Sequence, residues 1–161
     1  MNEAQAGKFT HLNADGQAKM VDVSDRSISV RTATATGKVH LAYEVITLLI
    51  NGNIPKGDVL ATARIAGIMA AKKTPDLIPL AHPIAIHGVE VSVEVVGKVV
   101  EIMATVTTAD RTGVEMEALT VVSVAGLTVI DMIKSLDPSA YISEIMLQRK
   151  DGGRNGLWER V

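Results

Sequence analysis

Residues 89–106, VEVSVEVVGKVVEIMATV, decide the fold. Four valines alternate with polar residues and therefore share one face of an extended strand: Val89, Val91, Val93 and Val95. Gly97-Lys98 then supplies a two-residue turn with glycine in the first position, where a positive φ is needed. The stretch therefore predicts an antiparallel β-hairpin with one apolar face.

Pairing Val96 with Val99 sets the register of this hairpin. The apolar face then joins apolar partners across the strands: Val93 with Ile102, Val91 with Ala104, and Val89 with Val106. A buried apolar face specifies register strongly, because a slip of one residue would turn it to solvent. The same register places Glu94 opposite Glu101, which is an unfavourable pair of like charges.

The segments before the hairpin predict a strand and two helices. The alternating stretch SISVRTATATG, residues 27–37, is typical of a strand, and residues 41–51 predict a short helix closed by Gly52. Residues 57–73 are rich in alanine with apolar residues at helical spacing, and Gly67 suggests close approach to another element. Three prolines make residues 74–83, TPDLIPLAHP, an irregular and rigid segment.

The segments after the hairpin complete the order βααββαβ. Thr112 and Glu115 have the spacing of a capping box that opens a long helix ending near Ser135. A last strand follows over residues 141–150. This order, with an antiparallel hairpin, predicts an α+β fold: a ferredoxin-like antiparallel sheet with helices packed on one face. We expect one domain over residues 1–161, with a mobile arm (1–20) and a flexible tail (150–161).

Composition excludes several classes of function. Aromatic residues make up 2% of the 161 residues and the formal net charge is −2, which disfavours both base stacking and the binding of duplex DNA. The chain has no cysteine, so disulfides and thiolate metal sites are unavailable. The apolar stretch Ala118–Ile130 is shorter than the roughly 20 residues of a membrane span. The N-terminus lacks the apolar core of a signal peptide, so we expect a cytoplasmic protein without a membrane partner.

The short sequence motifs of nucleotide binding and metal binding are incomplete in this chain. GNIPKG, residues 52–57, is followed by Asp58 where a phosphate-binding loop needs lysine, and GGRNG does not lead from a strand into a helix. The four histidines are scattered, with no pair at ligand spacing on a helix: His11, His40, His82 and His87. No metal site is predicted.

Asp131 and Lys134 lie three residues apart on the long helix, so they can form an ion pair. At the edge of a core such a pair can exchange protons with a substrate, although spacing alone favours an ordinary surface salt bridge.

Lys56 precedes a helix, whose free N–H groups favour anions. Other cations either add to a phosphate site or are solvated: Arg64, Lys72, Lys73, Lys150 and Arg154. His82 is a turn histidine, a proton shuttle or a hydrogen-bond donor to a phosphate, and the sequence in isolation favours the turn histidine. Glu115 is explained by the capping box, whereas Glu117 points elsewhere.

Five ordered blocks resemble one family, that of cyclic pyranopterin monophosphate synthase, protein C of molybdenum cofactor biosynthesis. The blocks are residues 10–25, 56–83, 112–120, 127–134 and 150–156. The resemblance implies a ferredoxin-like subunit assembled as a homohexamer, a trimer of dimers, with active sites at subunit interfaces. It implies conversion of (8S)-3′,8-cyclo-7,8-dihydroguanosine 5′-triphosphate to cyclic pyranopterin monophosphate with release of pyrophosphate.

The resemblance also implies the site residues. The catalytic set corresponds to Asp131, Lys134, Lys56 and His82, and the substrate-binding set to Leu80, Ala81, His82, Glu115, Met116, Glu117 and Lys150. A set of lysine, aspartate and histidine can carry proton transfers without a redox cofactor. No cofactor is therefore expected beyond Mg²⁺ bridging the phosphates, for which no protein cage is visible.

This sequence departs from the family pattern at three positions. Ala81 replaces a common cysteine, Ile130 replaces the usual tyrosine, and Asn155 replaces serine in the tail.

Two other functions of the chain stay open: a non-enzymatic, oligomeric nucleotide-binding regulator and a purely structural oligomer. Asp131 favours the enzyme, because a protein that only binds phosphate gains nothing from a carboxylate beside its cations.

Overall fold

The computed structural model describes residues 11–13, 15–154 and 156–161, so most of the predicted arm lies outside the described residues. Five strands form one antiparallel sheet in the order β2-β3-β1-β4-β5. The strands are β1 (Ser29–His40), β2 (Gly88–Val96), β3 (Val99–Asp110), β4 (Tyr141–Asp151) and β5 (Trp158–Glu159). The helices are α1 (Tyr43–Ile50), α2 (Val59–Ala71), α3 (Thr74–Leu77) and α4 (Glu115–Ile133).

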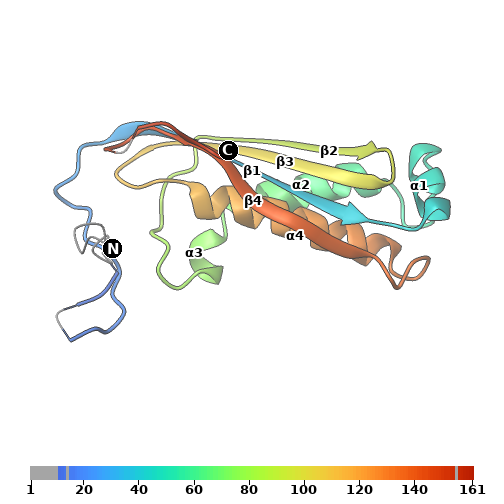
Figure 1. Ribbon diagram of the computed structural model, residues 1–161, viewed down its shortest axis with the longest axis horizontal. Helices are drawn as coiled ribbons and strands as arrows, with labels where there is room; N and C mark the ends of the chain where they lie inside the picture. The colour runs from blue at the N-terminus through green and yellow to red at the C-terminus, as the bar shows by residue number, and fades with distance from the viewer. Residues whose placement is uncertain (1–10, 14, 155) are drawn as a thin grey trace.

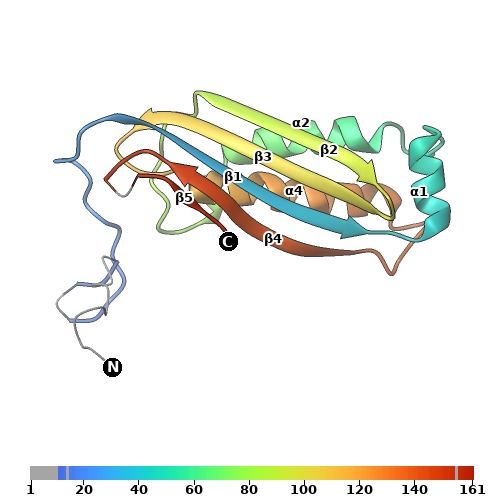
Figure 2. The same ribbon diagram turned by 45° about the horizontal axis from the view of Figure 1, so that its top comes forward.

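The α+β prediction and the order βααββαβ are confirmed, with α3 and β5 as short additions. Helices α2 and α4 lie side by side on one face of the sheet, while α1 covers the end at which β1 finishes (Figures 1 and 2). The first four strands follow the order β2-β3-β1-β4 of the ferredoxin-like arrangement.

The hairpin of β2 and β3 forms in the predicted register. Val96 pairs with Val99 beside the turn, where Val96 is exposed, and Val93 pairs with Ile102, both of which are buried beneath the helices. Gly97 opens the turn with a φ of 59°. Glu94 faces Glu101 as expected, on the side of the sheet that the helices leave uncovered. The apolar face thus decides the register even though it opposes two like charges on the other face.

The core lies between the sheet and the two long helices. Small residues let the layers approach closely: a Cβ at Gly37 of β1 would lie 2.6 Å from a methyl carbon of Val122 in α4. A Cβ at Gly67 of α2 would lie 3.0 Å from a methyl carbon of Val121, so the close approach predicted for Gly67 is found, and its neighbour is α4. This packing positions α4, whose two ends carry the candidate functional residues.

Two local predictions are wrong. The capping box at Thr112 and Glu115 does not form: Val114 is the N-cap residue and has no side-chain cap. The reason is tertiary, since the Glu115 carboxylate instead accepts a hydrogen bond from Lys150 of β4. The segment 74–83 is not wholly irregular, because Thr74–Leu77 form one helical turn with Pro75 in its first turn. The sequence pattern also did not predict β5, which pairs with the end of β4.

Helix α4 is long and apolar enough to cross a membrane, alone among the helices of the described ranges. However, 56% of its most apolar 18-residue window is buried inside the protein. Its apolar residues pack on the sheet and on α2, so α4 is the core helix of a globular domain.

Candidate functional site

A cavity of about 460 Å³ lies at the end of the molecule where α4 begins. Its walls come from the start of α4, the end of β4, the segment before β2 and the chain that leads into β1. All of the expected substrate-binding residues line it: Leu80, Ala81, His82, Glu115, Met116, Glu117 and Lys150. The fold therefore brings together four segments that are far apart in the sequence.

An ion pair crosses this cavity. Lys150 Nζ on β4 donates to Glu115 Oε1 on α4 at 3.0 Å, and about a third of each side chain is exposed. Such a partly exposed pair is easily opened by a ligand, because a phosphate group can take the place of the Glu115 carboxylate beside Lys150. Lys150 is thus held at the cavity wall and can exchange a carboxylate for a phosphate.

Glu117 is a buried carboxyl at the same wall. Glu117 is 3% exposed. Burial raises the pKa of its carboxyl above the ordinary value of 4.5, with a smaller contribution from the charge of Glu115. A carboxyl whose pKa is raised toward neutrality is suited to donating and accepting protons. Glu117 is therefore a buried, titratable carboxyl in the wall of the cavity, a placement that its position two residues after Glu115 did not reveal.

Glu117→Gln should stabilise the folded chain at neutral pH. Burial disfavours the charged carboxylate, so between pH 4.5 and the raised pKa the folded state holds more protons than the unfolded state. The free energy of unfolding therefore falls as pH rises through that window, and the neutral amide removes this loss. We expect urea unfolding to show Glu117→Gln above the wild type at pH 8 and the difference to close toward pH 5. A difference that was the same at both pH values would contradict this origin.

His82 lies on the same wall, and its Nε2 is 2.7 Å from the backbone carbonyl oxygen of Val21. Val21 and Val23 also line the cavity, so the segment leading into β1 forms part of the site. Ala81, beside His82, presents only a methyl group to the cavity. No thiol chemistry can take place at this position.

Sequence reasoning missed several cavity residues. Arg26 and Arg31 line the cavity together with Arg154, which had been noted only as added charge, and His11 joins them. Arg31 Nε donates to the Asp110 carbonyl oxygen at 3.0 Å, and a Cβ at Gly153 would lie 2.2 Å from Arg31 Nη1. Gly153 has a φ of 74°, which favours glycine, and a side chain there would displace the end of the Arg31 side chain from its place beneath the tail. Because Arg31 belongs to an ordinary alternating strand, no sequence pattern marked it.

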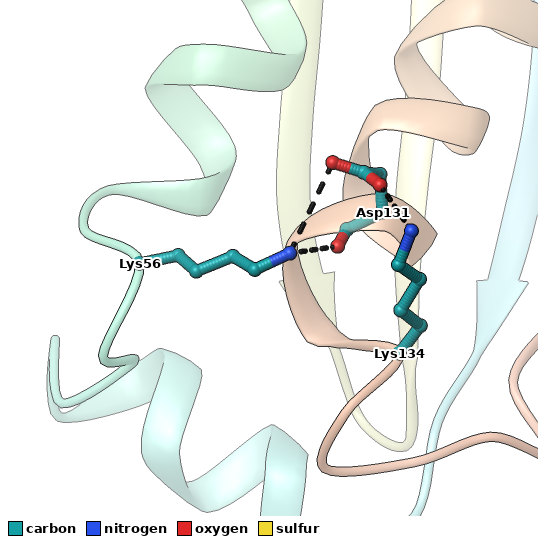
Figure 3. A network of polar contacts seen from close by, with 3 residues as sticks. All are labelled: Lys56, Asp131 and Lys134. Carbon is teal, nitrogen blue, oxygen red and sulfur yellow. Dashed lines mark hydrogen bonds and ion pairs between the residues drawn. The ribbon is translucent and has the colours of Figure 1, made fainter.

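A second polar cluster, formed by Lys56, Asp131 and Lys134, lies at the other end of α4 (Figure 3). Lys134 Nζ donates to Asp131 Oδ1 at 2.7 Å. Lys56 Nζ donates to the Asp131 backbone carbonyl at 2.6 Å and lies 4.0 Å from Oδ2. The hydrogen bond from Lys134 lowers the pKa of Asp131, with further lowering by the charges of Lys134 and Lys56. Asp131 is thus a solvent-exposed carboxylate that stays ionised.

The cluster and the cavity do not meet within one chain. Asp131 follows Glu117 by fourteen positions in α4, which is about 21 Å along the axis at about 1.5 Å per residue. Of the four expected catalytic residues, only His82 lines the cavity. The described residues also contain no group of three or more histidines and carboxylates that could hold a metal ion.

Comparison with known proteins gives one family. Residues 20–153 match the MoaC family. The chain is 55% identical over 153 residues to cyclic pyranopterin monophosphate synthase of Streptomyces avermitilis, covering 95% of this chain and 90% of that protein. It is 57% identical over 154 residues to the Streptomyces griseus protein of the same name, covering 96% and 87%. It is 51% identical over 159 residues to cyclic pyranopterin monophosphate synthase 2 of Mycobacterium tuberculosis, covering 99% and 95%. The chain therefore belongs to the MoaC family.

Proposed function

We propose that this chain is a cytoplasmic cyclic pyranopterin monophosphate synthase of molybdenum cofactor biosynthesis. It converts (8S)-3′,8-cyclo-7,8-dihydroguanosine 5′-triphosphate to cyclic pyranopterin monophosphate and releases pyrophosphate. The observation that carries the proposal is the cavity, in which a histidine and a buried carboxyl lie beside several cations. Such a set suits a substrate that must gain and lose protons while its phosphates are held.

The cations of the cavity fit the phosphate chemistry. To close a cyclic phosphate, a substrate hydroxyl oxygen forms a bond to the innermost phosphorus, and the bond from that phosphorus to the next bridging oxygen breaks. The hydroxyl proton passes to a base and the pyrophosphate leaves with additional negative charge. Arg31, Arg154 and Lys150 can stabilise that charge. A Mg²⁺ ion would be held mainly by the phosphates themselves, where it would neutralise part of the same charge.

The distance between cavity and cluster supports a site shared by two subunits. An α4 helix packed antiparallel on its copy about a two-fold axis near Val124 would bring Asp131 beside the partner subunit's Glu117. The outer face of the helical layer is apolar enough for such a contact, since Ile65, Met69 and Leu127 are 57%, 62% and 59% exposed. We propose a homohexamer, a trimer of dimers, in which each site combines the cavity of one subunit with the Asp131 cluster of another.

Sedimentation tests this assembly directly. At micromolar concentration the protein should sediment as a species several times larger than the 17.1 kDa chain. Single substitutions of Met69 or Leu127 by aspartate should shift it toward smaller species, because they bury a charge in an apolar contact. A monomer that kept full activity would rule out a shared site.

The reaction itself is tested by incubating the purified protein with the cyclised triphosphate. Cyclic pyranopterin monophosphate and pyrophosphate should appear in equal amounts, with no added redox cofactor. Binding of the triphosphate without turnover would instead favour the oligomeric nucleotide-binding regulator. Absence of both binding and turnover would favour a structural oligomer.

Lys56→Ala and Lys150→Ala should each lower kcat/KM by roughly ten- to a hundredfold, because each removes one charged hydrogen bond to a phosphate or to the Asp131 backbone. Lys98→Ala is the matched control. Lys98 is exposed on the turn between β2 and β3 and does not line the cavity, so its loss should leave the kinetics nearly unchanged. Steady-state kinetics with the cyclised triphosphate measure kcat/KM for the three variants. Equal damage from all three variants would mean that overall surface charge, and not a defined phosphate site, governs binding.

A further inference from the structure

His82 is the one described histidine whose hydrogen bond determines which ring nitrogen carries the proton. Its Nε2 lies 2.7 Å from the Val21 carbonyl oxygen, which can only accept. His40 Nε2 meets the Ser143 hydroxyl at 2.7 Å, and a hydroxyl can donate or accept. His87 Nδ1 lies near both the Ala85 carbonyl and the Ala109 N–H, so its contacts are compatible with either tautomer. Only the Val21–His82 contact requires a hydrogen on Nε2.

We infer that the Val21 carbonyl holds His82 in the Nε2–H tautomer, so that Nδ1 is the atom through which His82 exchanges protons with a bound substrate. A neutral imidazole with hydrogen on Nε2 has its lone pair on Nδ1. No hydrogen-bond partner of His82 Nδ1 is found within the described part of the chain, and His82 lines the cavity. Nδ1 is therefore the nitrogen left for a ligand.

The proton balance of the step is simple. A hydrogen on a substrate oxygen or nitrogen leaves with its bond electrons remaining on the substrate atom, and a new N–H bond forms at Nδ1. The resulting imidazolium keeps its Nε2–H bond to Val21, which becomes charge-assisted and stronger. The proton returns from Nδ1 to a substrate atom in a later step. Val21 acts here as a positioning residue through its backbone, and His82 is the group that meets the substrate.

The segment leading into β1 thus positions the His82 ring through the Val21 carbonyl. Val21, Val23 and Arg26 all line the cavity, although they precede the first strand of the sheet. The segment would orient His82 in the way that a backbone carbonyl orients the far nitrogen of a histidine in many active sites. The statement about the tautomer stands on the resting structure alone, whereas the statement about the substrate rests on the proposed function.

The tautomer is measured by long-range ¹H–¹⁵N correlation spectra of the full-length, ¹⁵N-histidine-labelled protein without substrate. The His82 signals are assigned by their loss in His82→Gln. At a pH at which His82 is neutral, Nε2 should show the shift of a protonated ring nitrogen and Nδ1 that of an unprotonated one. A resting protein with the hydrogen on Nδ1 would overturn the inference.

Two isosteric variants separate anchoring from proton transfer. In His82→Gln the side-chain amide nitrogen takes the place of Nε2 and can still donate to Val21, whereas in His82→Asn the amide takes the place of Nδ1. We expect both to lose about 10²- to 10⁴-fold in kcat, since both remove the base. Hydrogen exchange of residues 18–26 should be roughly two- to tenfold faster in His82→Asn only, because it alone loses the bond.

His87→Gln is the matched control, because His87 lies outside the cavity lining and should change neither turnover nor exchange. Faster exchange in His82→Gln than in His82→Asn would overturn the assignment of Nε2 to Val21. If the wild-type protein made no product, the proposed function would fail while the spectra and the exchange rates would still decide the tautomer. A His82→Gln protein that kept wild-type kcat with the expected tautomer would overturn the part concerning the substrate.

Discussion

Asp131→Asn should lower kcat by about 10²- to 10⁴-fold, the contribution typical of a positioned acid or base, while leaving the fold intact. The amide has the shape of the carboxylate, and the Asp131 side chain is 63% exposed, so no buried contact is lost. What disappears is the charge that Lys134 and Lys56 approach from two sides. Single-turnover kinetics with the cyclised triphosphate measure the loss, and circular dichroism verifies the fold.

Asp76→Asn is the matched control for this variant. Asp76 also forms an ion pair three residues from a lysine, with Lys73 Nζ at 3.4 Å, and its side chain is 69% exposed. It lies outside both the cavity lining and the Asp131 cluster, so turnover should stay at the wild-type level. Near-normal product formation by Asp131→Asn would remove Asp131 from the catalytic set and make its pair with Lys134 an ordinary surface salt bridge.

Mixing two inactive variants should restore activity to about a quarter of the wild-type level if two subunits share each site. Asp131→Asn damages the cluster and His82→Gln damages the cavity. When the two variants mix at random, half of the dimers contain one subunit of each variant. One of the two sites in such a dimer combines an intact cluster with an intact cavity. Unfolding and refolding the two variants together, followed by the product assay, measures the recovery.

The same two variants refolded separately and then combined give the control, because intact oligomers that do not exchange subunits should stay inactive. A double variant that carries both substitutions in one chain, refolded together with the wild type, further distinguishes a site shared by two subunits from a site within one chain. Failure of the mixed sample to recover, despite verified mixed oligomers, would show that cluster and cavity work within the same chain. That result would conflict with their separation along α4.

Features that rest on local periodicity were predictable from the sequence. The period of two over residues 89–106 specified the β2–β3 register to the residue, because only one alignment buries every inward valine. The alanine-rich period over residues 57–73 predicted α2 to within two residues at each end. Gly67, whose missing side chain admits Val121 of α4, was recognisable as a point of close packing.

Features that depend on distant partners were not predictable. Glu115 follows the rule for a capping box locally, but Lys150 of β4 takes its carboxylate. The start of α1 has no side-chain cap nearby, and the Ala42 N–H instead donates to Asp137 Oδ2 at 2.7 Å from 95 residues away. Strand β5 contains two residues and is defined only by its pairing with β4. No local pattern encodes such contacts.

The candidate site likewise has a part that the sequence predicts and a part that depends on distant partners. The family blocks predicted which side chains form it, because those residues occur in order along the chain whatever their spatial arrangement. Only the tertiary structure decided that His82, Glu117 and Lys150 line one cavity, that Arg31 joins them beneath Gly153, and that Asp131 lies at the opposite end of α4. The sequence by itself determined the main elements, their order along the chain and the β2–β3 register, since these depend on periodicity and turn chemistry, whereas α3 and β5 were not predicted. The tertiary structure decided the pairing of charges and the separation of the two clusters, because a rigid helix holds its ends apart and sheet pairing joins distant segments.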